Sequence, residues 1–294
     1  MAIMSNSGND TMLIRDGGRM KDIKLAGPGS LRGEVEIGYD LHTDPITGLS
    51  SLGETVLREH NEILLGGTLF ALEKLFNVPA DLNVAYLNDI IGFGTDGPAI
   101  NEKYPKETGL CLFNIGIGGC GSAYTDVKAV LQQLRQLDTM IPFRVVDEPF
   151  EPGSEEAAKY WMMKQHTDGK YWYYGKTFAK TPVIKALWKD AGDGEDGSPV
   201  VESDYSSVKN TPIETFAEAV LALEVTDLRE YFELYSNITD ARFNTIGLCT
   251  GIKSTCADGR PEYKQVKQFS ALNFSNEMLH MNKDLSVIYR IYSA

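Results

Sequence analysis

Apolar and polar residues alternate along several short stretches of the chain. In one of the clearest, Val35, Ile37 and Tyr39 alternate with Glu34 and Glu36. Alternation with a period of about two residues puts the apolar side chains on one face, as in a half-buried β-strand. This pattern, together with apolar and aromatic-rich runs, predicts strands from residue 33 and at 55–59, 85–87, 170–178, 183–189, 216–225, 244–251, 266–274 and 285–292.

Other stretches have a helical period. In residues 123–138 the apolar positions form one stripe of an amphipathic helix, namely Val127, Val130, Leu131, Leu134 and Leu137. Residues 66–77 contain a second helix-like stretch, and Thr226 with Asp227 can cap a short third one. The chain is therefore predicted to be a β-rich α+β protein with sandwich-like antiparallel sheets and a few helices, notably at about 66–77 and 123–138.

The first residues differ from the rest in composition. Residues 1–22 are rich in Asn, Ser, Gly and Asp without hydrophobic periodicity, which is typical of a flexible N-terminal arm. We expect residues 23–294 to form a single elongated β-rich domain. A division into two subdomains near residue 150, where the loop Glu-Pro-Phe-Glu-Pro follows Asp147, remains an open alternative.

Charge and hydropathy exclude some classes of function. The 294 residues include 28 Lys and Arg and 41 Asp and Glu, a formal net charge of -13. Such a protein repels phosphates, so specific contact with nucleic acid is not expected. No apolar run approaches the roughly 18 residues needed to cross a bilayer, and the first 25 residues lack a signal-peptide core. We expect no membrane partner, and synthesis in a cytoplasm.

Metal-binding residue types are scattered. The histidines, His42, His60, His166 and His280, have no His or Cys neighbours at ligand spacing. The cysteines, Cys111, Cys120, Cys249 and Cys256, match neither a zinc ribbon nor a C-x-x-C pair. We therefore expect free buried thiols and no metal. The alternative, a disulfide between spatial neighbours, would need an oxidising surrounding.

Candidate catalytic groups are equally weak. Carboxylate pairs such as Glu54 with Glu59 and Asp227 with Glu230 are expected by chance among 41 acidic residues. Cys120 would become nucleophilic if it stood at a helix N-terminus, but no His or Asn partner can be assigned to it. The prediction is no catalytic residue, no cofactor and no small-molecule substrate.

One glycine segment points the other way. Gly116, Gly118 and Gly121 form a G-x-G-x-x-G motif between an apolar run and a predicted helix, which in a strand-turn-helix unit is a dinucleotide fingerprint. The acidic residue expected about 20 residues later comes late, at Asp147, and no alternation of strands and helices follows. The alternative is a tight turn in which the glycines, Gly118 in particular, supply positive φ and close packing.

Residues 170–178 contain five aromatics. Stacking on single-stranded nucleic acid would need more positive charge than Lys170 and Lys176 supply. Packing in a core or against another subunit fits better, and a receptor- or carbohydrate-binding surface is a third reading. The acidic segment 190–197 fails the EF-hand register and is expected to be a solvated hairpin tip.

Several segments together resemble virion structural proteins of tailed bacteriophages. In the N-terminal half these are GEVEIGYD (33–40), NEILLGG (61–67) with the helix-like stretch after it, and IGFGTDG (91–97). The middle adds IGIGGCG (115–121), IPFR (141–144) and YYGKTF (173–178). The C-terminal half adds DLREYF (227–232), ARFNTIGLCTG (241–251), FSALNFSNE (269–277) and IYRIY (288–292).

The resemblance implies a component of the neck, tail or baseplate region without enzymatic activity. It implies that the chain resides in the virion and that its partners are copies of itself and other virion proteins. On this view the G-x-G-x-x-G segment is a turn, and the aromatics and charges serve subunit contacts. The alternative remains a nucleotide- or NAD-binding enzyme that uses Gly116, Gly118 and Gly121.

Overall fold

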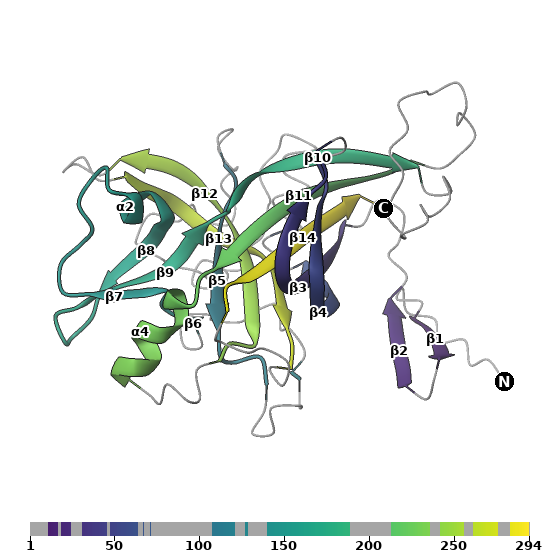
Figure 1. Cartoon of the computed structure of the whole chain (residues 1–294), viewed down its shortest axis with the longest axis horizontal. Helices are drawn as coiled ribbons and strands as arrows, with labels where there is room; N and C mark the ends of the chain where they lie inside the picture. The colour runs from purple at the N-terminus through teal and green to yellow at the C-terminus, as the bar shows by residue number, and fades with distance from the viewer. Residues whose placement is uncertain are drawn as a thin grey trace, which may run out of the picture.

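The computed structural model describes residues 11–16, 19–24, 31–45, 48–63, 67, 71, 108–120, 127–128, 140–188, 213–235, 242–255, 261–275 and 283–293. Within them the chain is a β-rich α+β protein, as predicted, and its strands pair antiparallel (Figure 1). The elements are β1 (Thr11–Asp16), β2 (Arg19–Lys24), β3 (Leu31–Thr43), β4 (Ser50–Ile63), β5 (Gly109–Gly116), β6 (Met140–Ile141), β7 (Arg144–Val146), α2 (Glu155–Lys159), β8 (Tyr160–Gln165), β9 (Tyr171–Thr177), β10 (Lys180–Trp188), β11 (Ile213–Leu223), α4 (Thr226–Tyr235), β12 (Thr245–Thr255), β13 (Pro261–Asn273) and β14 (Leu285–Ser293).

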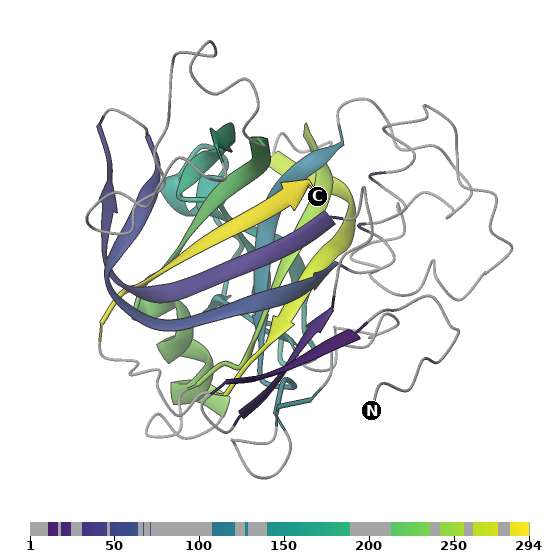
Figure 2. The ribbon, with the colours of Figure 1, turned by 90° about the vertical axis from the view of Figure 1, so that its right-hand side faces the viewer.

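Twelve strands form one sheet, in the order β10-β11-β14-β3-β4-β13-β12-β5-β9-β7, with β6 beside β5 and β8 beside β9. Strand β4 joins its two halves, because most of β4 pairs with β3 while Glu62 and Ile63 pair with β13. Strands that switch partners in this way form the corners of sandwich-like folds. Figure 2 shows the half with β3, β4 and β14 curving towards the half with β5, β12 and β13.

One hydrophobic core lies between the two halves. Strand β14 buries alternate residues in it, Leu285, Val287, Tyr289 and Ile291. The opposite half contributes side chains such as Phe113 and Ile246 to the same cluster. Burial of this apolar surface is the main favourable term that closes the sheet around the core. A second cluster, around Leu112, Trp161 and Cys249, lies on the other face of the β5-β12 half.

Most predicted strands within the described ranges are confirmed. Alternation located β3, β11 and β14, and the aromatic run located β9. The helix expected after Thr226 is α4. The strand predicted at 55–59 is part of the much longer β4, and the strand predicted at 85–87 lies outside the described residues.

The long helix predictions fare differently. Of residues 66–77 the structure describes Gly67 and Ala71, and both are helical. The helix predicted at 123–138 is wrong at Val127, which forms an isolated antiparallel bridge with Cys120 and is 44% exposed. The cause is local pairing, because Lys128 donates its N–H to the carbonyl of Gly119 and holds this segment against the turn. Lys128 is not helical either, and the remaining residues of that prediction lie outside the described ones.

The predicted flexible arm contains an antiparallel hairpin. Strands β1 and β2 pair with each other, and the twelve-stranded sheet does not include them (Figure 1). The boundaries proposed for the domain, including a division near residue 150, stay a prediction. Strands from both sides of residue 150 nevertheless mix in the sheet, since β3 pairs with β14 and β5 with β12.

Candidate functional site

The outer face of the β11-β14-β3 half carries a buried ionic cluster, which we call the Arg290 cluster. Its guanidinium donates from Nη1 to Glu36 Oε1 at 2.8 Å and from Nε to Glu218 Oε2 at 3.0 Å. The third donor, Nη2, binds the carbonyl oxygen of Ser50 at 2.6 Å. Both carboxylates are buried. Burial disfavours the charged guanidinium, but the carboxylates of Glu218 and Glu36 outweigh it and raise the pKa of Arg290.

The Arg290 cluster fixes the turn between β3 and β4 on the sheet. Ser50 donates its N–H to Glu218 Oε1 at 3.0 Å and accepts from Arg290, so both backbone groups of Ser50 are bound. Arg58 approaches Glu36 Oε1 at 3.1 Å from the exposed side. Three fixed directions of a guanidinium define this geometry more narrowly than a lysine would. The cluster therefore shapes the sheet and leaves no unpaired carboxylate.

A second ionic cluster lies at the start of α4. Lys176 of β9 donates to Asp227 Oδ2 at 2.6 Å, and Tyr160 of β8 donates to Asp227 Oδ1 at 2.7 Å. The N–H of Glu224 donates to the same carboxylate at 2.7 Å. Burial raises the pKa of Asp227, whereas Lys176, Tyr160 and the Glu224 N–H act in the opposite direction. Three donors around one buried carboxylate bind α4 to β8 and β9.

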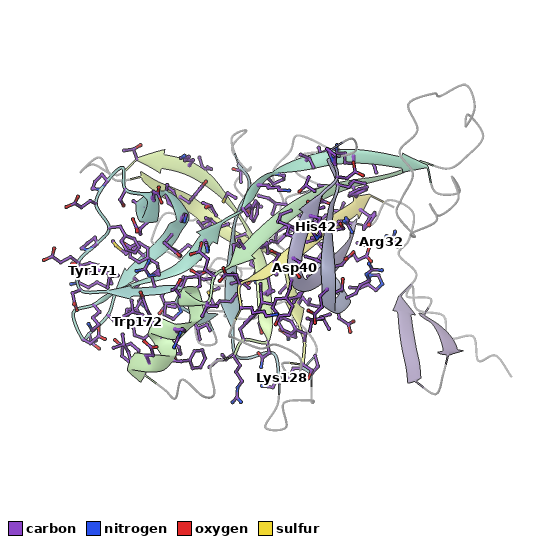
Figure 3. The ribbon with its side chains drawn as sticks, viewed as in Figure 1. Arg32, Asp40, His42, Lys128, Tyr171 and Trp172 are labelled. Carbon is purple, nitrogen blue, oxygen red and sulfur yellow. The ribbon has the colours of Figure 1, made fainter. Side chains whose placement is uncertain are left out.

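An aromatic cluster lies where β8 and β9 meet α4. The ring of Trp172 stacks on His166 at 3.9 Å and is tilted against Tyr235 at 4.8 Å. Tyr231 meets it edge-on at 5.8 Å, and His166 Nε2 hydrogen-bonds the hydroxyl of Tyr174 at 2.8 Å. Figure 3 shows Trp172 beside α4, away from Asp40 and His42 on the β3-β4 hairpin. The indole of Trp172 is thus half-buried among aromatic neighbours, which fits the predicted packing role.

The glycine segment is a site of close backbone packing. Gly116 ends β5, which pairs antiparallel with β12, β6 and β9. Gly119 donates its N–H to Asn244 Oδ1 at 2.7 Å, and a Cβ there would lie 2.0 Å from the Asn244 carbonyl oxygen. Gly118 does not have the predicted positive φ; among the described glycines positive φ occurs at Gly48, Gly153 and Gly169. Gly121 lies outside the described residues.

Three cysteines are free thiols, in agreement with the prediction. Cys120 and Cys249 are buried and Cys111 is half-buried. Cys120 donates to the carbonyl of Phe274 at 3.1 Å and forms a β-bridge with Val127, so its thiol is bound within the described part of the fold. Burial raises the pKa of Cys111 to about 12, which keeps this thiol protonated at neutral pH. Cys256 lies outside the described residues.

The other candidate side chains do not converge. His42 and His60 are exposed on β3 and β4, and His166 belongs to the aromatic cluster. Asp227 is bound by Lys176, whereas Glu230 accepts from Arg144 at 2.9 Å, so this carboxylate pair is split between two ion pairs. In the described ranges no group of three or more His, Cys, Asp or Glu side chains is placed to hold a metal ion.

Sequence reasoning missed both ionic clusters. The available signal was a charge inside an apolar strand: Arg290 within IYRIY, Glu218 within FAEAV and Lys176 within YYGKTF. A charge that alternation places on a buried face requires a partner. The partners themselves come from distant strands and cannot be read from spacing.

No protein-family model, curated protein or solved structure matches this chain. Among the helices of the described residues, none has the length and apolar character to span a bilayer.

Proposed function

We propose that this chain is a non-enzymatic structural component of a tailed-phage virion. It assembles with copies of itself and with other virion proteins into a ring or symmetric set in the neck, tail or baseplate region. The sequence resemblance, over segments spread from residue 33 to residue 292, supports this assignment. An antiparallel sheet with long strands offers faces and edges for repeated subunit contacts.

One observation supports a structural role more than the others: the buried charges of both clusters form ion pairs with one another inside the fold. Arg290 satisfies Glu36 and Glu218, and Lys176 satisfies Asp227. Active sites instead place ionisable groups in a cleft, where they face a substrate. The Arg290 cluster joins β14 to β3, β11 and β4, and the cluster around Asp227 joins β8 and β9 to α4, as expected of a scaffold.

The alternative, a nucleotide- or NAD-binding enzyme, gains no support from the strand before the glycine motif. The dinucleotide fingerprint requires a parallel strand, a turn and a helix whose N-terminus faces the pyrophosphate. Here β5 is antiparallel to its neighbours, and the N–H of Gly119 is bound by Asn244. Under the proposal the Gly119 N–H has a structural role and does not bind a phosphate.

The test is whether the chain is part of a particle. Tailed particles purified from the host that makes this chain should contain its peptides by mass spectrometry, in a fixed ratio to the major capsid protein. Gold-labelled antibody against the chain should mark the neck, tail or baseplate, and antibody depleted with purified chain should not. Particles that form fully without the chain, or gold found only on free protein, contradict the proposal.

A ligand-binding experiment distinguishes the structural proposal from the enzyme alternative. A dinucleotide that binds the fold raises its melting temperature by mass action and alters the fluorescence of Trp161, Trp172 or Trp188. We expect no change with NAD or ATP. A saturable shift would favour the enzyme.

A further inference from the structure

We propose that the open edge of β10 is a dimerisation surface, along which the same strand of a second copy pairs antiparallel. This goes beyond the proposed function, because it concerns the isolated chain and holds whether or not the chain belongs to a virion. The surface, called the β10 edge below, comprises Val183–Trp188, which pairs residue by residue with β11 on one side. On its other side no described strand pairs with it. Unpaired edges of this kind are templates for an incoming strand.

The two ends of the sheet differ in how they are protected. At the opposite end, Met162 in β8 adopts a left-handed conformation with φ of 59°, and the register with β9 omits it. Such an irregularity blunts an edge. In β10 the irregularity lies at Lys180 to Val183, which includes Pro182, and the strand then continues regularly to Trp188. The regular part of β10 is therefore the longer uninterrupted edge of the two.

Lysines that usually guard an edge are turned away from this one. Lys180 donates to the Thr43 hydroxyl at the end of β3. The Lys185 ammonium lies 3.3 Å from the point where a Cβ on Gly48 would stand, over the β3-β4 turn. Both amines thus lean towards the neighbouring hairpin. Exposed lysines placed on an edge normally oppose strand addition, and here their charges are displaced from it.

An apolar side chain takes their place. Ile184 is 82% exposed and Val183 is 38% exposed. Because Ile184 is opposite Ala217 while Lys185 is opposite Phe216, Ile184 and Lys185 lie on opposite faces of the sheet. An isoleucine this exposed at an open edge is the kind of surface that association covers.

The strand is complementary to itself. If the two copies cross at Ile184, each Val183 lies opposite the Lys185 of the second copy, so no lysine faces a lysine there. The two Ile184 side chains fall on the same face and touch across the two-fold axis. This pairing covers the β10 edges of both copies and closes the assembly about a two-fold axis. The second copy of this chain is therefore the occupant we infer.

So short an edge buries little area, and contacts below roughly 1,200 Å² are usually weak. The purified full-length chain should accordingly approach twice its mass of 32.5 kDa only as concentration rises. Analytical ultracentrifugation over a wide concentration range measures this equilibrium. A chain that stays monomeric at the highest concentration overturns the proposal.

Ile184→Lys tests the surface itself. The change should not disturb folding, because the side chain is already in solvent, but it places two ammonium groups opposite each other. The dimer dissociation constant should rise by at least about tenfold, with an unchanged circular dichroism spectrum. Leu234→Lys is the matched control, since Leu234 is 53% exposed on α4, and it should leave dimerisation intact. A dimer that persists in Ile184→Lys, or that is lost equally in both variants, contradicts the proposal that the β10 edge is the dimerisation surface.

A cross-link tests the register. Opposed residues of antiparallel strands have Cβ atoms about 5 Å apart, so Ile184→Cys should give a reducible covalent dimer when copper phenanthroline and air are added. Leu234→Cys and the unchanged chain should not. A covalent dimer absent from Ile184→Cys, under conditions where ultracentrifugation shows association, rejects the proposed register. If the cross-link forms but the gold-labelled antibody does not mark the particles, the dimer is supported and the virion assignment fails.

Discussion

The Lys176 ammonium lies 2.6 Å from a carboxylate oxygen of Asp227, with 4% and 0% of the two side chains exposed. This ion pair links β9, near one end of the sheet, to the first turn of α4. Two charges removed from water are tolerated only when they neutralise each other and find further hydrogen bonds. Tyr160 and the N–H of Glu224 supply those bonds to Asp227.

Replacing Lys176 with Met should therefore be strongly destabilising. The carboxylate of Asp227 would stay buried without its counter-charge, and removal of one partner of a buried pair costs about 3–5 kcal/mol. Urea unfolding followed by circular dichroism measures the change in the free energy of unfolding. Lys170→Met is the control, because Lys170 pairs with Asp147, whose side chain is 85% exposed, and it should leave the free energy of unfolding nearly unchanged. Equal losses in the two variants would contradict this account.

The Arg290 cluster predicts that charge alone is not sufficient at position 290. Arg290→Lys keeps the positive charge, but a lysine cannot reach Glu36, Glu218 and the Ser50 carbonyl in three fixed directions. We expect a loss of about 1–3 kcal/mol, because at least one buried acceptor is left unpaired. Thermal and urea unfolding give the measurement.

Arg229→Lys is the matched control for Arg290→Lys. Arg229 makes an exposed pair with Glu233 on α4, with 53% and 52% of the side chains in solvent. An exposed ion pair contributes little to the free energy of unfolding, so Arg229→Lys should leave stability nearly unchanged. A neutral Arg290→Lys would mean that the turn at Ser50 is held by something else.

The period of hydrophobicity predicted those strands whose two faces differ. In β14, Tyr289 and Ile291 face the core and Arg290 faces the ionic cluster, so alternation is visible in the sequence. Sheet order was not predictable, because β3 lies between β14 and β4 through contacts between residues far apart in the chain. The helix predicted at residue 127 failed for a related reason, since pairing with Cys120 overrode an amphipathic pattern.

The candidate site was predictable in the same partial way. A single sequence indicates that Lys176 sits in an apolar strand and needs a partner, but not that Asp227 is the partner. Similarly, the sequence predicted close packing in the glycine segment. It did not predict that Gly119 is the closely packed residue or that Asn244 is its neighbour, because both depend on the pairing of β5 with β12. Contacts between residues far apart in the chain depend on the sheet topology, so they cannot be predicted until the topology is known.

Gly119→Ala should destabilise the fold. The added methyl would lie 2.0 Å from the Asn244 carbonyl oxygen, so the backbone must move, and overpacking of this kind costs at least about 1–3 kcal/mol. Gly109→Ala, in the same strand region, has nothing within 4 Å of the new Cβ. It should be neutral or stabilise by about 0.4–1 kcal/mol through the unfolded chain. Differential scanning calorimetry distinguishes the two, and equal melting temperatures would contradict the close approach.

The contact between His166 and Trp172 predicts a pH-dependent signal. Burial lowers the pKa of His166 below 6.5, and Lys164 adds to this while Asp168 opposes it. An imidazole with a lowered pKa favours the neutral ring in the folded state. Its contribution to stability is therefore fully present above pH 6.5 and is lost as pH falls from 6.5 through the folded-state pKa.

Trp172 reports this titration because the protonated imidazole, stacked 3.9 Å away, quenches indole fluorescence. We expect emission to fall with a midpoint below pH 6.5 while the fold persists. His166→Gln should abolish the transition, and Trp161→Phe should keep it, because the Trp161 ring packs against Tyr263. A midpoint at or above 6.5, or a transition that survives in His166→Gln, would show that a different group titrates.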